Sequence, residues 1–178
     1  MTFSQFDPAA QNRVPWNFGV KIGPKQPFNQ KQIWAIQFFL DLEKRIRDRA
    51  LFDVAIDSKL RGCDLVELKI GDLVKGPEIR KRAAITQRKM GRPVQFEIAL
   101  DARGSLFAWL ELRGGSVEDY VFPSRVGHSR HLSTRQYARI VDEWVEAIGL
   151  RPEEYGSHSL RRTKTSIVFK ATGNLRAI

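Results

Sequence analysis

A histidine and an arginine spaced three residues apart are the side chains in this sequence best suited to chemistry on a phosphate group. His158 and Arg161 lie in residues 156–163, at the expected start of a helix, and their spacing puts both on one face of it. The N-terminus of a helix adds partial positive charge and free N–H groups at the same place. An arginine holds two phosphate oxygens in a fork, and a histidine transfers a proton near neutral pH. By itself the pair is also typical of a basic surface helix with a histidine in its capping turn.

Three further segments carry basic residues at turns and helix starts. Residues 60–65, Leu-Arg-Gly-Cys-Asp-Leu, open a helix with Arg61. Residues 87–94, Gln-Arg-Lys-Met-Gly-Arg-Pro-Val, form a hairpin turn. Residues 121–125, Val-Phe-Pro-Ser-Arg, are followed by residues 132–137, which begin a capped helix. In their order and spacing, these segments together resemble the catalytic domain of the tyrosine recombinases, the phage integrase family.

The resemblance covers residues 29–178 and implies four catalytic residues. Arg61 and Arg161 are similar to the two family arginines that clamp the non-bridging oxygens of the scissile phosphate while it becomes five-coordinate. Lys89 resembles the hairpin lysine that acts as general acid for the leaving 5′ hydroxyl. His158 resembles the family's proton-handling residue. The family's chemistry needs no metal and no cofactor.

The basic neighbours of these residues are predicted to contact DNA. Arg88 and Arg92 compete with Lys89 for the general-acid role, because the sequence leaves the register of the hairpin open. Arg162 and Lys164 are interpreted as phosphate contacts or solvated charges. Asp64 stands where the family usually has an acidic residue, and it is expected to orient the first arginine through a salt bridge.

The nucleophile that the resemblance requires has no counterpart among the tyrosines. Tyr120, Tyr137 and Tyr155 all precede Arg161, whereas the family's tyrosine follows this region. The one-turn amphipathic pattern after Gly173 is too short to be a stable helix by itself. We therefore expect this chain to be an inactive fragment whose nucleophile lies beyond its last residue.

The implied function is site-specific DNA recombination or integration, in which a DNA strand is cleaved and rejoined through a 3′-phosphotyrosyl intermediate. The implied partners are double-stranded DNA and further copies of the full-length protein, assembled as a tetramer on DNA. Two alternatives stay open at this point: a non-catalytic DNA-binding module that acts by occupancy, and a basic RNA-binding protein.

The elements that must position these residues indicate a mainly α fold with a small antiparallel β-sheet. Residues 1–28, with four prolines and no periodicity, are expected to form an extended N-terminal arm before a catalytic domain over residues 29–178. Asn29 and Gln32 predict a capping box for a helix that runs to about Arg47.

The remaining pattern predicts further helices around a β hairpin. Helices are expected over residues 51–57, 61–68 and 133–148, and over residues 158–171 with Ser157 as the cap. Residues 83–87 and 94–100 alternate as strands around Gly91, and residues 70–74 are expected to add another strand.

The composition fits a nucleic-acid partner and excludes several other classes. The 178 residues include 30 lysines and arginines against 20 aspartates and glutamates, for a formal charge of +10. Cys63 is the only cysteine, so no intramolecular disulfide forms. No apolar run approaches the roughly 20 residues that span a bilayer. The sequence thus predicts no membrane association and a place in the prokaryotic cytoplasm, on DNA.

His128 and His131 lack a carboxylate or cysteine cluster, so no metal site is predicted.

Overall fold

The computed structural model describes residues 23–174 and is mainly helical, with two small antiparallel sheets. In chain order the elements are α2 (Gln30–Leu42), α3 (Ile46–Ser58), α4 (Gly62–Val66), α5 (Ile70–Leu73), β1 (Val74–Lys75), β2 (Glu78–Ile79), β3 (Arg82–Thr86), β4 (Pro93–Glu97), α6 (Leu100–Arg113), α7 (Thr134–Ala147) and α8 (Ser157–Thr172). This architecture confirms the predicted fold class. Within the described residues, no helix combines the length and apolarity needed to cross a membrane.

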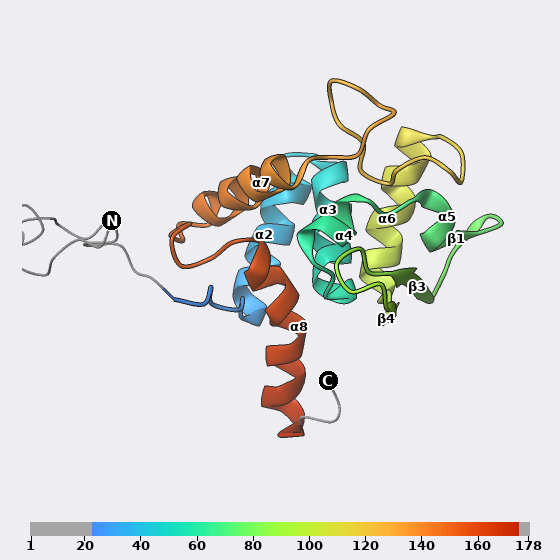
Figure 1. The fold of residues 1–178 in the computed structure, drawn as a ribbon. Helices are drawn as coiled ribbons and strands as arrows, with labels where there is room; N and C mark the ends of the chain where they lie inside the picture. Colours follow the sequence, from blue (N-terminus) through green and yellow to red (C-terminus); the bar gives the residue numbers. More distant parts are fainter. Residues whose placement is uncertain (1–22, 175–178) are drawn as a thin grey trace, which may run out of the picture.

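Helix α3 is the centre of the core. It packs against α2, α6 and α8, and Figure 1 shows these helices arranged around it. Its residues Leu51, Phe52 and Val54 are almost completely buried. The Phe52 ring lies edge-on to Trp144 of α7, with centroids 5.5 Å apart. A helix buried on most of its surface is a fixed frame for the segment that follows it, and that segment carries Arg61.

The helix ends are set by local signals, several of which the sequence predicts. Asn29 Oδ1 accepts a hydrogen bond from the Gln32 N–H, and Gln32 Oε1 accepts one from the Asn29 N–H, which confirms the capping box of α2. Ser133 Oγ caps α7 by accepting from the Gln136 N–H. Gly149, with φ +75°, lies just after α7.

Several predicted boundaries are wrong, three of them at helix ends. The first helix ends at Leu42 rather than near Arg47, because Lys44 adopts a left-handed conformation (φ +52°) that reverses the chain. The next helix accordingly begins at Ile46, earlier than predicted. The last helix is capped by Gly156 rather than by Ser157, which is its first helical residue.

The predicted strand over residues 70–74 is also wrong for most of its length. Residues 70–73 form the short helix α5, and only Val74 begins a strand. Asp72 Oδ2 accepts from the Lys69 N–H at 2.8 Å, and the N–H groups of Ile70 and Gly71 donate to carbonyls of the loop that follows α6. The backbone donors that a strand would use are therefore committed to a distant loop. The hairpin of β3 and β4 is confirmed, with Ala84 opposite Gln95.

The described part of the predicted N-terminal arm lies on the α7–α8 connection. Lys25 Nζ donates to the carbonyls of Pro152 and Glu153, at 2.7 and 2.8 Å. The Phe28 side chain is buried and stacks on Tyr155, with centroids 5.0 Å apart. Residues 1–22 of the arm lie outside the described residues.

Candidate phosphate-binding site

Arg61 is the N-cap residue of α4, directly after the core helix α3. Lys59 ends α3 in a left-handed conformation (φ +54°), which turns the chain toward α4. Leu60 is buried and fixes the turn, whereas Arg61 is half-buried. The arginine therefore extends from a short, anchored turn rather than from a long loop.

The start of α4 lies against the ring of Tyr137 in α7. A Cβ atom placed on Gly62 would lie 3.3 Å from Cδ1 and Cε1 of that ring, which is closer than side chains normally pack. Tyr137 is itself buried in the core. Glycine at position 62 thus allows α4, which Arg61 caps, to approach α7 closely.

The β3–β4 hairpin is attached to α4 by two side chains. Arg61 Nη1 donates to Gln87 Oε1 at 3.1 Å, and Asp64 Oδ1 accepts from the Arg88 N–H at 3.0 Å. Asp64 is buried, and its Oδ2 has no hydrogen-bond partner. The salt bridge expected between Arg61 and Asp64 is absent among the described residues, since Asp64 holds the hairpin backbone instead.

Lys89 lies in the tip of this hairpin. The turn closes through hydrogen bonds from the Gly91 N–H to the Gln87 carbonyl and from the Gln87 N–H to the Arg92 carbonyl. Gly91 has the predicted positive φ, +60°. Lys89 and Arg92 are exposed, and within residues 23–174 neither side chain has a hydrogen bond or ion pair. Both ammonium and guanidinium are therefore available to an anion.

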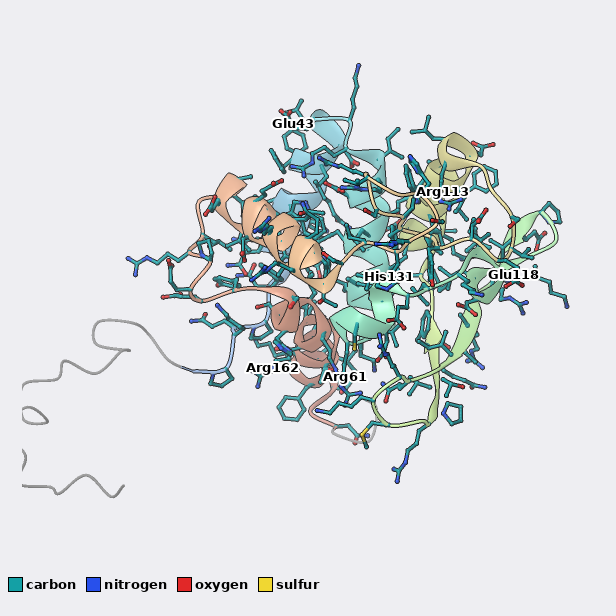
Figure 2. The ribbon with its side chains drawn as sticks, turned by 45° about the horizontal axis from the view of Figure 1, so that its top comes forward. Glu43, Arg61, Arg113, Glu118, His131 and Arg162 are labelled. Atoms are coloured by element: carbon teal, nitrogen blue, oxygen red, sulfur yellow. The ribbon has the colours of Figure 1, made fainter. Side chains whose placement is uncertain are left out.

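His158 and Arg161 belong to helix α8, which is attached to the end of α3 close to Arg61 in the chain. Lys164 Nζ donates to Asp57 Oδ1 at 2.7 Å, which ties α8 to the last turn of α3, four residues before Arg61. In Figure 2, Arg61 lies between the α8 ribbon and the hairpin. His158 is exposed in the first turn of α8, and Arg161 is half-buried one turn further along.

The other basic residues that were predicted to contact DNA differ in whether their side chains already have partners within the protein. The Arg88 guanidinium pairs with the Glu67 carboxylate. Arg162 Nη1 donates to the Lys25 carbonyl at 3.1 Å, and its side chain is otherwise exposed. Lys164 is half-buried by its bond to Asp57. Arg88 and Lys164 therefore hold elements together in this structure.

Two residues of the site were missed in the sequence. Gln87 receives the hydrogen bond from Arg61, and Glu67 receives the Arg88 guanidinium and lies 3.7 Å from His131 Nε2. The only sequence signal for Gln87 is its place beside the basic turn. Glu67 has the appearance of an ordinary surface glutamate, because its partners are distant in the sequence.

The tyrosines of the chain are poorly placed to act as nucleophiles. Tyr137 is buried, and this burial raises the pKa of its hydroxyl well above the ordinary value. Tyr155 is also buried, and its hydroxyl accepts from Gln32 Nε2 at 3.0 Å. Tyr120 is half-buried with its ring edge-on to His131. Across residues 23–174, no group of three or more His, Cys, Asp or Glu side chains is arranged to hold a metal ion.

Comparison with known proteins gives one family. The sequence model of the phage integrase family matches residues 27–178. The tyrosine recombinase XerC of Escherichia coli O157:H7 (strain EC4115 / EHEC) is 27% identical over 135 residues, which are 75% of this chain and 43% of that protein. The chain thus spans less than half the length of this relative.

Solved structures of recombinases share the fold. The XerA recombinase has a TM-score of 0.71 at 21% identity, over 94% of this chain and 59% of that one. XerH, solved with its difH substrate in a pre-cleavage complex, gives 0.66 at 19% identity, over 88% and 46%. Lambda integrase residues 75–356 bound to DNA give 0.64 at 18% identity, over 85% and 54%.

Proposed function

Because this chain belongs to the phage integrase family, we propose that it forms the catalytic domain of a site-specific recombinase that cleaves and rejoins duplex DNA. The single observation that carries the proposal is the match to this family over residues 27–178, and the attachment of Arg61 to the hairpin that bears Lys89 supports it. Its place of action is then the prokaryotic cytoplasm, where the DNA lies.

The proposed site binds one phosphate of the DNA backbone. Arg61 and Arg161 hold the two non-bridging oxygens and stabilise the charge that accumulates when phosphorus becomes five-coordinate. A tyrosine oxygen attacks phosphorus, and the bond to the 5′ oxygen breaks. Lys89 donates a proton to that leaving oxygen, and His158 accepts the proton that the attacking tyrosine hydroxyl gives up.

The second step reverses the first on a partner strand. A 5′ hydroxyl attacks the 3′-phosphotyrosyl group and gives its proton to Lys89. The bond from phosphorus to the tyrosine oxygen breaks, and the tyrosine oxygen recovers its proton from His158. Each phosphate ester is exchanged for another, so bond energy is conserved and no nucleotide cofactor is consumed. Exchange between two duplexes requires four strand cuts, and we propose a tetramer on DNA as the full-length assembly.

This chain by itself is not expected to form the covalent intermediate, since Tyr137 and Tyr155 are buried and Tyr120 is packed on His131. The check is a nicked suicide duplex, which traps a covalent protein–DNA adduct that survives denaturing electrophoresis. We expect no adduct. A trapped adduct would show that one of these three tyrosines reaches the phosphate.

Binding to duplex DNA tests the proposed partner. We expect the logarithm of the association constant to fall linearly with the logarithm of salt concentration, because phosphate contacts release counterions. Replacement of both Arg61 and Arg161 by glutamine is expected to weaken binding by roughly 10- to 1,000-fold. The matched control replaces Lys31 and Lys44, two exposed lysines of the α2 region, by glutamine.

The same titrations separate the rival functions. Tight binding to structured RNA, with no loss on changing Arg61 and Arg161, would replace the proposal with an RNA-binding function. An affinity for duplex DNA that does not change with salt would also contradict it.

A further inference from the structure

Half of the positive charge of this chain is confined to three acid-free segments. Residues 79–96, 120–141 and 155–178 contain 15 of the 30 lysines and arginines and none of the 20 aspartates and glutamates. The remaining residues carry 15 cations against 20 acids, a formal charge of −5, although the whole chain has +10. The first segment contains Lys89, and the third contains Arg161. The second contains no residue of the proposed site.

The described parts of the three segments, which end at residue 174, adjoin one another in the fold. Glu67 Oε1 receives the Arg88 guanidinium of the first segment and lies 3.7 Å from His131 Nε2 of the second. The first and third segments line one cavity, to which Arg82 and Lys164 both contribute. Charge that is spread along the sequence is therefore gathered around the hairpin.

The second segment presents its charge on an ordered loop, residues 124–131. The Ser124 N–H donates to the Arg130 carbonyl at 2.8 Å, and the Arg130 N–H donates to the Gly127 carbonyl at 2.9 Å. Arg125 and Arg130 are exposed, and Val126 between them is 98% exposed. A loop fixed by its own backbone hydrogen bonds loses little conformational entropy when its side chains bind a partner.

The two loop arginines are also unpaired. In the described structure, Arg45, Arg82 and Arg88 each form an ion pair with a carboxylate, and several other cations of the surface do so too. Arg125 and Arg130 have no such partner within the same residues, and the segment around them contains no acid that could supply one. Two exposed guanidinium groups without a carboxylate partner on one short loop are available to an external anion.

We propose that the loop of residues 124–131 is a second contact to the DNA backbone, in which Arg125 and Arg130 each bind a phosphate outside the scissile site. The inference rests on the proposed function and extends its DNA surface from the hairpin across Glu67 to this loop. Because the contacts are to phosphates, they add affinity without preference for a base sequence.

The test replaces Arg125 and Arg130 together by glutamine and measures duplex binding by fluorescence anisotropy over a series of salt concentrations. The control replaces Lys31 and Lys44 by glutamine, which removes the same amount of charge from elsewhere on the surface. We expect the loop variant to bind roughly 10- to 100-fold more weakly at low salt and its log–log salt slope to fall by about 2. The control slope is expected to stay at the original value. Both variants are expected to keep the thermal midpoint of the original chain, since all four side chains are exposed.

The outcomes distinguish this inference from the function on which it rests. If the original chain binds duplex DNA with a steep salt dependence and the loop variant does the same, the loop contact is wrong and the proposed function stands. If the original chain does not bind duplex DNA, the proposed function itself is wrong. A loss as large in the lysine control as in the loop variant would mean that overall charge, rather than this loop, determines affinity.

Discussion

Asp64 is the residue whose role is fixed most closely by its surroundings. Its carboxylate is buried in the middle of α4, and Oδ1 accepts the N–H of Arg88, which lies 24 residues further along the chain in the hairpin. Replacement by alanine would leave that N–H without an acceptor. Loss of one partner of a buried hydrogen bond destabilises a protein more than loss of both.

We expect Asp64→Ala to lower the free energy of unfolding by about 1–3 kcal/mol in urea denaturation. Asp64→Asn keeps an acceptor oxygen and is expected to lose less. Amide hydrogen exchange at Arg88 should become faster in the alanine variant. The control is Glu118→Ala, which removes an exposed partner of Lys69 and should change stability by less than about 1 kcal/mol. Equal stability of Asp64→Ala and the original chain would mean that the hairpin is held by other contacts.

Asp53 in α3 makes the free energy of unfolding depend on pH. Desolvation raises the pKa of its carboxyl above the ordinary value, although Arg49, Gln37 and Ser105 all stabilise the charged form. The folded state therefore binds the proton more strongly than the unfolded state. The resulting contribution to stability is present below the unfolded pKa and is lost as pH rises through the folded pKa.

The measurement is urea denaturation of the original chain and of Asp53→Asn from about pH 4 to pH 7. The stability of the asparagine variant relative to the original chain is expected to rise over this range. The difference between the two proteins removes the contributions of Asp142, whose pKa is also raised, and of Glu97, whose pKa is lowered. A difference that falls with increasing pH would reverse the assigned sign.

At the scale of elements, α4, which Arg61 caps, packs against α7. A Cβ atom at position 62 would lie 3.3 Å from the Tyr137 ring, and that ring is buried among core residues. We expect Gly62→Ala to lower the free energy of unfolding by about 1–3 kcal/mol, because the added methyl group overpacks the interface.

The same variant should weaken duplex binding when both proteins are fully folded, since a tilt of α4 moves Arg61 away from the hairpin. A suitable control is Gly104→Ala in α6, where nothing lies within 4 Å of the added atom. Alanine at position 104 is expected to be neutral or stabilising, because alanine favours helix more than glycine does. If Gly62→Ala is as stable as the original chain, α7 shifts to accommodate the methyl group with no loss in the free energy of unfolding.

The elements that the sequence predicts well are those with local signals. Asn29 with Gln32, Ser133 and Gly91 each act within a few residues, and the corresponding helix starts and hairpin turn are found. The strand predicted over residues 70–74 fails for the opposite reason, since its backbone donors bond to a loop more than 40 residues away. Likewise, the hydrogen bond from Arg61 to Gln87 joins two segments whose separation no periodicity reveals.

At the scale of the whole molecule, side-chain contacts between distant segments link the elements that carry the predicted site residues. The predicted hairpin lysine, first arginine and His-x-x-Arg helix are far apart in the sequence, and the structure attaches α4 to the hairpin and α8 to the end of α3. Their catalytic roles remain proposals. Independently of those roles, half of the lysines and arginines fall in segments without acids, and Glu67 lies between two of these segments.

A double-mutant cycle tests most directly the proposal that Arg61 and Arg161 hold the same phosphate. Duplex affinity is measured for the original chain, Arg61→Gln, Arg161→Gln and the double variant at one low salt concentration. Two side chains that share a ligand group are expected to be coupled by about 0.5–3 kcal/mol. Effects that add to within about 0.3 kcal/mol would mean that the two arginines act at separate places, and the proposed site would be wrong.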